Sequence, residues 1–201
     1  MMRVFFLIIL ATSFLSANAQ EDKSPADRKI VLKTNPFGAM ANMIPLSAEY
    51  MIGENFSISA NGYIVNSENG SGASYFRQNG YSIGPEFRYY FAETQNKGQV
   101  NRVYLGGQYS YEDFTNRTLD FYGDPINGWA HGTGGALVVG NQWFFKNRFT
   151  VDIFLGPAYT AYYKNDDFET NLANGGFFMG IVGPKVTGTK VKFGFNIGIT
   201  L

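Results

Sequence analysis

Apolar and polar side chains alternate along much of this chain, most regularly in YSIGPEFRYYF, residues 81–91. In an extended strand, successive side chains point to opposite faces. One face of this segment carries Tyr81, Ile83, Pro85, Phe87, Tyr89 and Phe91, and the other carries Ser82, Gly84, Glu86, Arg88 and Tyr90. The pattern predicts a β-strand with one aromatic face and one face that holds charge.

We predict eight strands with this alternation, and hence an all-β fold. They cover residues 29–41, 44–53, 55–66, 79–91, 101–113, 129–145, 148–163 and 189–201. The 19 Phe and 13 Tyr residues favour strands, and the 24 glycines favour turns. After residue 19, no apolar run reaches the roughly 18 residues that a membrane helix requires.

The connectors differ in length between the two ends of the predicted strands. At one end they are 53–55, 92–101 and 146–147, and at the other a short link near Asn42 and the long segments 67–80, 115–128 and 164–188. Short periplasmic turns and longer external loops are typical of outer-membrane barrels. The asymmetry predicts an eight-stranded antiparallel up-and-down transmembrane β-barrel over residues 29–201. The stretch 175–188 reads as a further short strand, which we assign to the last external loop or to an outward extension of the eighth strand.

The apolar faces are predicted to point outward, towards lipid. An eight-stranded barrel is just wide enough inside for side chains to fill, and roughly forty large apolar residues would overfill it. The opposite faces carry polar residues and several glycines, namely Gly84, Gly106, Gly156, Gly194 and Gly198. Tyr89, Phe91, Trp143 and Phe145 lie near the periplasmic strand ends, where an aromatic girdle belongs.

Eight charged side chains fall on the predicted inward faces. The bases are Lys33, Arg88, Lys190 and Lys192, and the acids are Glu49, Glu86, Glu112 and Asp152. Isolated buried charges cost several kcal/mol each, so balanced charges in a narrow barrel are expected to pair. This predicts a lumen charge network that plugs the barrel.

Two prolines, Pro85 and Pro157, lie inside predicted strands, each preceded by glycine. Proline cannot donate a hydrogen bond to a neighbouring strand. We therefore predict β-bulges at both Gly-Pro pairs.

The first nineteen residues have the features of a secretory signal peptide. Arg3 precedes an apolar core from Val4 to Leu10, and Ala17-Asn18-Ala19 forms an A-x-A cleavage site. Residues 20–28 are charged and predict a flexible lead-in. The chain has no cysteine, which excludes a disulfide framework and an N-terminal lipid anchor on cysteine.

The charge balance argues against a nucleic-acid partner. Removal of Arg3 with the leader leaves 15 of the 16 basic residues against 16 acidic residues. A nucleic-acid-binding surface normally requires a clear excess of positive charge. The partners expected from the predicted location are outer-membrane lipid, lipopolysaccharide and the barrel assembly machinery.

Four motifs resemble a family of uncharacterised Gram-negative outer-membrane proteins. They are TNPFG (34–38), IGPEFRYYF (83–91), VGNQWFF (139–145) and LGPAY (155–159). That family is similar to the eight-stranded barrels of OmpA and OmpX type. The resemblance implies a fold and a location, and it brings no catalytic residues. Many such barrels end in Phe, whereas this chain ends in Leu201.

His131 is the single histidine, so a site with several histidines is excluded. Some outer-membrane barrels modify lipid A with a histidine and a nearby serine at the external surface. His131 is predicted at the external end of its strand, close to Asp113, Asp120 and Asp124. The sequence HGT, however, places Thr133 where the His-x-Ser pattern requires serine.

No metal or cofactor site is predicted. The acidic segment 165–170 lacks the spacing and the glycine of a calcium loop. GTGG at 132–135 lies in a strand-like context rather than before a helix, which argues against a nucleotide site. Five loop aromatics could bind a partner or pack against the barrel rim: Tyr75, Phe76, Tyr122, Phe177 and Phe178.

The hypothesis from the sequence is a non-enzymatic outer-membrane barrel that serves in envelope structure or in surface interaction through its external loops. One alternative is a lipid-modifying enzyme that uses His131. A second alternative is a soluble periplasmic ligand-binding barrel, because such barrels also alternate polar and apolar faces.

Overall fold

The structure is a computed structural model of the 201-residue chain. It describes residues 29–70, 75–96, 98–120, 122–145, 148–168 and 187–201. The predicted signal peptide and lead-in lie outside these residues, as does most of the stretch 175–188.

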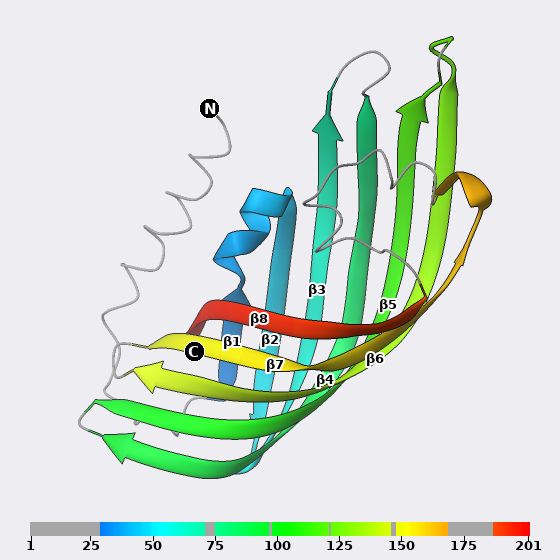
Figure 1. The fold of residues 1–201 in the computed structure, drawn as a ribbon. Coiled ribbons are helices and arrows are strands. Elements are labelled where there is room, and N and C mark those ends of the chain that lie inside the picture. The colour runs from blue at the N-terminus through cyan, green and yellow to red at the C-terminus, as the bar shows by residue number, and fades with distance from the viewer. Residues whose placement is uncertain (1–28, 71–74, 97, 121, 146–147, 169–186) are drawn as a thin grey trace.

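Within the described residues, eight antiparallel strands follow one another around a closed barrel, and β8 pairs with β1 to close it (Figure 1). Their bounds are β1 Ile30–Thr34, β2 Met43–Ile52, β3 Phe56–Asn69, β4 Phe76–Asn96, β5 Gln99–Leu119, β6 Pro125–Phe145, β7 Phe149–Lys164 and β8 Gly188–Thr200. A short 3-10 helix, η2, covers Pro36–Ala41. The prediction of an eight-stranded up-and-down barrel is confirmed. None of the helices in the described ranges has the length and apolarity needed to cross a membrane.

The first strand is shorter than predicted, because β1 ends at Thr34 instead of continuing to 41. Asn35 turns the chain: its side-chain Oδ1 accepts a hydrogen bond from the Phe37 amide, and its carbonyl accepts one from Gly38. Pro36 has no amide hydrogen for a strand ladder and is well suited to a first helical position. These local bonds explain why η2 replaces the second half of the predicted strand.

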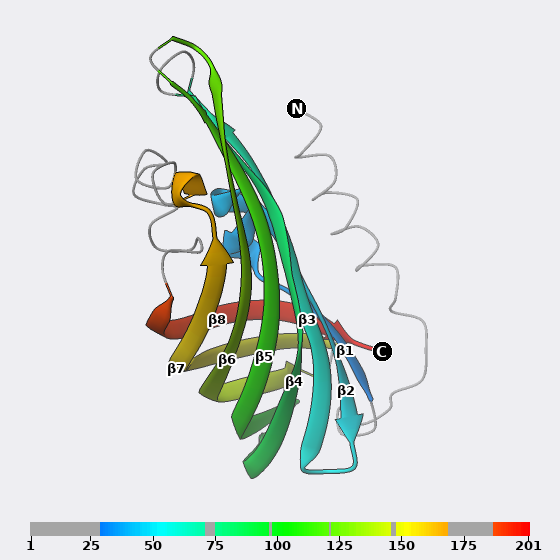
Figure 2. The ribbon, with the colours of Figure 1, turned by 90° about the vertical axis from the view of Figure 1, so that its right-hand side faces the viewer.

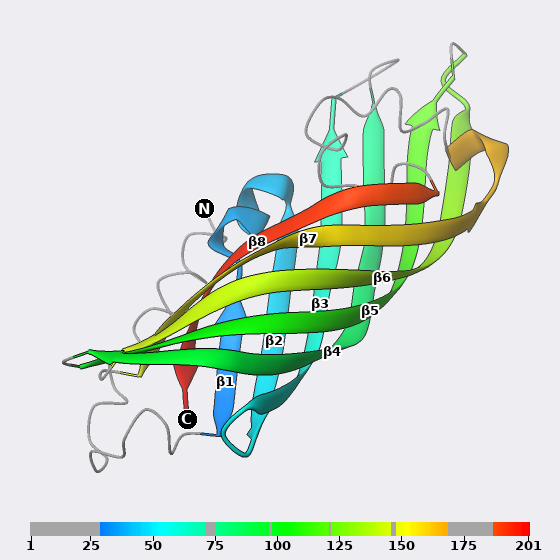
Figure 3. The same cartoon turned by 60° about the horizontal axis from the view of Figure 1, so that its bottom comes forward.

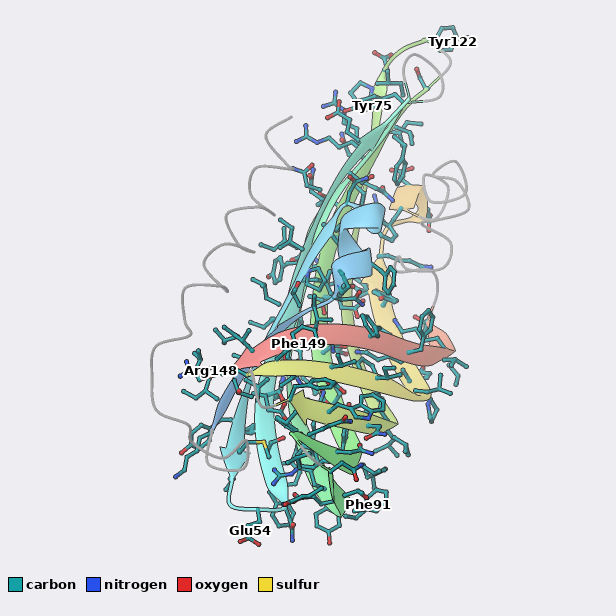
Figure 4. All side chains as sticks on the ribbon, turned by 90° about the vertical axis from the view of Figure 1, so that its left-hand side faces the viewer. Glu54, Tyr75, Phe91, Tyr122, Arg148 and Phe149 are labelled. Carbon is teal, nitrogen blue, oxygen red and sulfur yellow. The ribbon has the colours of Figure 1, made fainter. Side chains whose placement is uncertain are left out.

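The strands β4, β5 and β6 are much longer than predicted, with 21 residues each. They continue through most of the predicted loops, since Asn69 pairs with Phe76 and Leu119 pairs with Pro125. At the end predicted to face the periplasm, called the periplasmic end below, Asn96 pairs with Gln99, so the predicted connector 92–101 contains a tight turn in which Gly98 has φ 80°. Together with β3, these three strands form a tall wall that rises beyond the other strands on the side predicted to be external (Figure 2). Tyr75 and Tyr122 lie at its tip, and Glu54 and Phe91 lie at the opposite end (Figure 4).

The inward and outward faces follow the sequence alternation. Arg88 and Asp152 are fully buried, whereas Ile83, Leu155 and Phe193 are 57%, 58% and 73% exposed. Outward aromatic side chains form tilted pairs between neighbouring strands near the periplasmic end, such as Phe56 with Tyr89 and Phe145 with Phe149. The polar side chains therefore occupy the interior, and the large apolar ones cover the outer wall.

The predicted bulges at the Gly-Pro pairs are absent. The pairing of β4 with β5 is interrupted only at Gly84 and Pro85, and it resumes in the same register. The pairing of β7 with β6 is interrupted in the same way at Gly156 and Pro157. A Cβ atom on Gly84 would lie 1.9 Å from the Tyr109 carbonyl oxygen. Glycine therefore allows the backbones of β4 and β5 to lie close together beside Pro85, which has no amide hydrogen to donate to β5. The shift of register in β4 lies instead between Tyr90 and Ala92.

The two Gly-Pro pairs flank a hollow of about 710 Å³ on the outer wall. Its middle is formed by Gly107 and Gly135, which place no side chain there, and Pro85 and Pro157 lie on either side. In this region β4 to β8 sweep across the lower half of the barrel as a curved sheet (Figure 3). The hollow is a dent in the apolar surface of that sheet.

Candidate functional site

Four charged side chains from four strands meet in the periplasmic half of the lumen. Lys33 comes from β1, Glu49 from β2, Arg88 from β4 and Asp152 from β7, and each side chain is at most 1% exposed. Each residue lies on the inward parity of its strand. The alternation that places aromatic residues outside thus places these charges inside.

Asp152 contacts both bases. Its Oδ2 accepts hydrogen bonds from Lys33 Nζ at 3.0 Å and from Arg88 Nη1 at 2.9 Å, and its Oδ1 accepts one from the Tyr104 hydroxyl at 2.8 Å. Lys33 and Asp152 are 119 residues apart in the chain. They meet because β8, the neighbour of β7, closes the barrel against β1.

Glu49 is held by four donors from the surrounding wall. Lys33 Nζ lies 2.8 Å from its Oε2 and Gln142 Nε2 lies 3.1 Å from the same oxygen, while the hydroxyls of Ser57 and Tyr90 contact Oε1. A buried carboxylate is tolerated when its oxygens are satisfied in this way. Glu49 therefore connects β2 to β1, β3, β4 and β6.

Arg88 extends the network towards the external side. Its Nε donates to Glu86 Oε1 at 2.6 Å, and Asn61 Nδ2 donates to the other oxygen of Glu86 at 2.7 Å. The guanidinium also lies over the Tyr104 ring, 4.1 Å from the ring centroid. Two bases and three acids give this lumen charge network, Lys33, Glu49, Glu86, Arg88 and Asp152, a formal charge of minus one.

The other three residues of the predicted network form no ion pair with these five within the described residues, although Lys192 is close enough to Glu86 and Glu112 for their charges to act on it. Glu112 is buried and accepts a short hydrogen bond from the Tyr162 hydroxyl, and Lys192 is half-buried and donates to Gln108 Oε1. Lys190 is exposed near the external start of β8. The sequence suggested a single balanced set; in the structure its periplasmic members are joined by direct ion pairs, whereas Glu112, Lys190 and Lys192 form none within the described residues.

An apolar cluster closes the lumen further towards the external side. Phe168, which follows β7, is 1% exposed and packs with Val65, Phe114 and Ala130. Asn116 Nδ2 donates to the Phe168 carbonyl at 3.0 Å, which holds Phe168 against β5. Asn165, from the predicted acidic patch, accepts a hydrogen bond from the Trp129 amide at 2.9 Å instead of facing a ligand.

Several residues of the network were not singled out from the sequence. They are Ser57, Asn61, Tyr90, Tyr104 and Gln142. All five are uncharged. Each lies at an inward-facing position in the alternation of its strand, and this position is the signal that could have found them. Tyrosine hydroxyls and side-chain amides supply hydrogen-bond donors to the buried carboxylates, and a search for charged residues alone does not find them.

His131 lies on the outward face of β6, at the external edge of the apolar band. Its Nδ1 lies 3.1 Å from Asp113 Oδ2, and its ring packs 5.2 Å from the Trp129 ring. Thr133 is two residues further along the same face, and no hydrogen bond joins it to His131 in the described part of the chain. The histidine has an orienting carboxylate, as a general base requires, but its link to a nucleophile is missing.

The remaining candidates have simpler roles. Among the described residues, no three metal-ligating side chains converge. Residues 132–135 lie within β6, Phe76 is buried, and Tyr122 is 87% exposed. Phe177 and Phe178 lie outside the described residues.

The fold defines the class: an eight-stranded antiparallel barrel with a polar interior and an apolar exterior. The chain belongs to a family described as protein of unknown function (DUF3575), whose model matches residues 4–184. The predicted membership of an uncharacterised barrel family is confirmed.

Among solved structures, the chain is similar to the N-terminal β-barrel domain of Pseudomonas aeruginosa OprF, at 12% identity and a TM-score of 0.47, over 87% of this chain and 98% of that one. It is also similar to Acinetobacter baumannii CarO, at 7% identity and a TM-score of 0.35, over 90% and 100% of the two chains. A sequence comparison with curated proteins gives no match.

Proposed function

We propose that this protein is an exported, integral outer-membrane barrel with a closed lumen, which acts in envelope structure or in surface interaction through its tall external strands. The observation that carries the proposal is the reversal of polarity: charged side chains are buried, and large apolar side chains are exposed. A soluble protein rarely exposes a contiguous apolar surface of more than a few hundred Å². Lipid, rather than water, is the solvent that this outer wall suits.

Two groups of side chains inside the lumen, the lumen charge network and the cluster around Phe168, support a barrel that does not conduct ions. The lumen charge network crosses the periplasmic half with direct hydrogen bonds between side chains of β1 to β7, and the Phe168 cluster packs inside the wall nearer the external end. Water-filled barrels have more strands, whereas eight strands leave an interior that side chains fill. A structural or adhesive role uses the outer surface and the external tip, and needs no opening.

Cell fractionation and bilayer recording test this proposal together. We expect the protein in the membrane fraction, extracted by detergent, and migrating differently on gels before and after heating. Purified protein in a planar bilayer should show no steady conductance. Recovery in the osmotic-shock supernatant would favour the soluble periplasmic alternative, and a stable open channel would contradict the closed lumen.

The contact between Asp113 and His131 favours lipid modification as a second candidate function. The carboxylate, the imidazole and the Thr133 hydroxyl all face outward on β5 and β6 at the external edge of the apolar band. Incubation of the purified protein with lipid A, followed by mass spectrometry, tests this candidate. Loss of an acyl chain that depends on His131 and Thr133, compared in His131→Ala and Thr133→Ala variants, would support it. Identical lipid A masses with and without the protein would dismiss it.

A further inference from the structure

A hollow of about 420 Å³ lies on the outward side of the tall wall formed by β4, β5 and β6. Its outward-facing lining consists of Arg77 and Asn79 from β4, Thr115 and Arg117 from β5, and Asn127 and Trp129 from β6. Every one of these side chains offers a hydrogen-bond donor. The hollow is therefore polar, unlike the apolar dent lower on the same wall.

Two arginines lie directly opposite each other in this hollow. Arg77 pairs with Arg117 in the register of β4 and β5, and both are exposed. Like charges at facing positions on a sheet are destabilising, because their Cβ atoms are only about 5 Å apart. Glu68 is the neighbour of Arg77 on β3, and neither arginine forms an ion pair in the described part of the chain. Two guanidiniums and one carboxylate leave this row with a net charge of plus one.

The arginines lie just beyond the external aromatic edge of the apolar band. Tyr81 and Tyr111 form an outward ring pair with centroids 6.3 Å apart, and Trp129 packs 5.3 Å from Tyr163. Arg77 is four residues beyond Tyr81, which is about 13 Å along a strand and about 9 Å along the membrane normal at a tilt near 45°. This height corresponds to the head groups of the outer leaflet.

We propose that this hollow binds a phosphate group of a phosphorylated glycolipid in the outer leaflet. The inference rests on the membrane location proposed above. Guanidinium groups bind phosphate through paired hydrogen bonds, and two of them on one rigid sheet are already arranged for this. Asn79, Asn127 and Thr115 supply further donors around the arginines, and the Trp129 ring offers a flat face to a sugar. A bound phosphate would also relieve the repulsion between Arg77 and Arg117.

Native mass spectrometry of the full chain in detergent micelles tests the site. The probes are bisphosphorylated lipid A and lipid A from which both phosphates have been removed. We expect the wild type to bind the phosphorylated form at least tenfold more tightly. The double variant Arg77→Gln/Arg117→Gln should lose this preference, and Arg77→Lys/Arg117→Lys should lose part of it, because lysine keeps the charge but not the paired hydrogen bonds.

A second double variant, Lys29→Gln/Lys190→Gln, provides the matched control. It removes two positive charges far from the hollow and should keep the wild-type preference. Equal binding of both lipids by the wild type, or an unchanged preference in Arg77→Gln/Arg117→Gln, would overturn the proposal. Complete displacement of the lipid by millimolar inorganic phosphate would also overturn it, because the site would then select free phosphate.

The gel shift on heating, recorded for every variant, reports whether the barrel is folded. Recovery of the wild type in a soluble cell fraction would contradict the membrane location, whatever the lipid-binding result. A membrane-bound wild type with no phosphate preference would contradict the arginine site alone.

Discussion

The two halves of the lumen are held by different interactions. In the periplasmic half, Lys33, Glu49, Arg88 and Asp152 form ion pairs with one another and are fully buried. In the external half, Glu112 contacts a tyrosine and Lys192 contacts an amide. The periplasmic half therefore depends on direct ion pairs, whereas the external half depends on hydrogen bonds and on apolar packing around Phe168.

Strand length explains this difference. At the periplasmic end all eight strands of the described residues surround the lumen, and the network side chains of Lys33, Glu49, Arg88 and Asp152 are at most 1% exposed. At the external end β3, β4, β5 and β6 continue beyond β2 and β7, so the wall is incomplete and Lys190 is exposed (Figure 2). Buried charges require complete pairing, and only the enclosed half provides it.

Removal of the Asp152 carboxylate should have the largest effect on this comparison. Asp152→Ala leaves both Lys33 and Arg88 with less compensation in a buried site. Breaking a buried ion pair from one side costs about 3 to 5 kcal/mol, so the free energy of unfolding should fall by that amount. Urea unfolding in lipid vesicles measures it, and a change below about 1 kcal/mol would show that the network contributes little.

A charge on the outer wall should have the next largest effect. Ile153 follows Asp152 in β7 but points outward and is 45% exposed. Ile153→Arg should reduce the free energy of unfolding in vesicles by about 2 kcal/mol or more, because arginine inside the hydrocarbon region is poorly solvated. Tyr122→Arg at the external tip is the matched control and should be nearly neutral. Equal effects at both positions would contradict the placement of β7 in lipid.

Glu112→Gln in the external half should cost about 1 kcal/mol, well below the cost of Asp152→Ala. The new amide oxygen still accepts a hydrogen bond from the Tyr162 hydroxyl, and no base forms an ion pair with Glu112 in the described part of the chain. The same unfolding experiment measures it. A loss as large as that of Asp152→Ala would mean that the two halves of the lumen are equally dependent on charge.

The pair of Arg102 and Glu93 at the periplasmic rim should matter least. Arg102 Nε lies 2.6 Å from Glu93 Oε2, but the Glu93 side chain is 35% exposed. The Arg102 side chain is only 8% exposed, so the variant is made at its more exposed partner: Glu93→Gln should change the free energy of unfolding by less than about 1 kcal/mol, and the effect should shrink further in high salt. A large effect that is independent of salt would place this pair in the buried network.

The number of strands and the direction of their faces could be predicted from the sequence, because alternation with period two is a local property. In β4, β7 and β8 the predicted inward and outward residues are those observed. The external extension of β4, β5 and β6 could not be predicted in the same way. Residues 115–119 and 125–128 carry mostly polar or small side chains on both faces, so their sequence shows no apolar alternation and resembles a loop, although Asn116 and Thr118 are buried on the inner face.

The partners within the lumen could not be predicted either. Parity places Lys33 and Asp152 on the inside, but their contact depends on how β8 joins β1 and on the register of each pair of strands. Charge counting grouped Lys192 with the buried bases, although its height in the barrel places it beside Gln108. Likewise, Pro85 and Pro157 suggested β-bulges, whereas the glycine before each proline allows the strand pairing to be interrupted without a change of register.

The central claim is that lipid surrounds the apolar face of the strands while the polar face is sealed inside. Because the chain has no cysteine, single-cysteine variants at Ile58 and Ser59 carry a spin label at two neighbouring positions of β3, one exposed and one buried. In reconstituted vesicles, the label at Ile58 should collide readily with oxygen and poorly with a water-soluble nickel complex. The label at Ser59 should be shielded from both. Ready access of the nickel complex to the label at Ile58 would contradict the account.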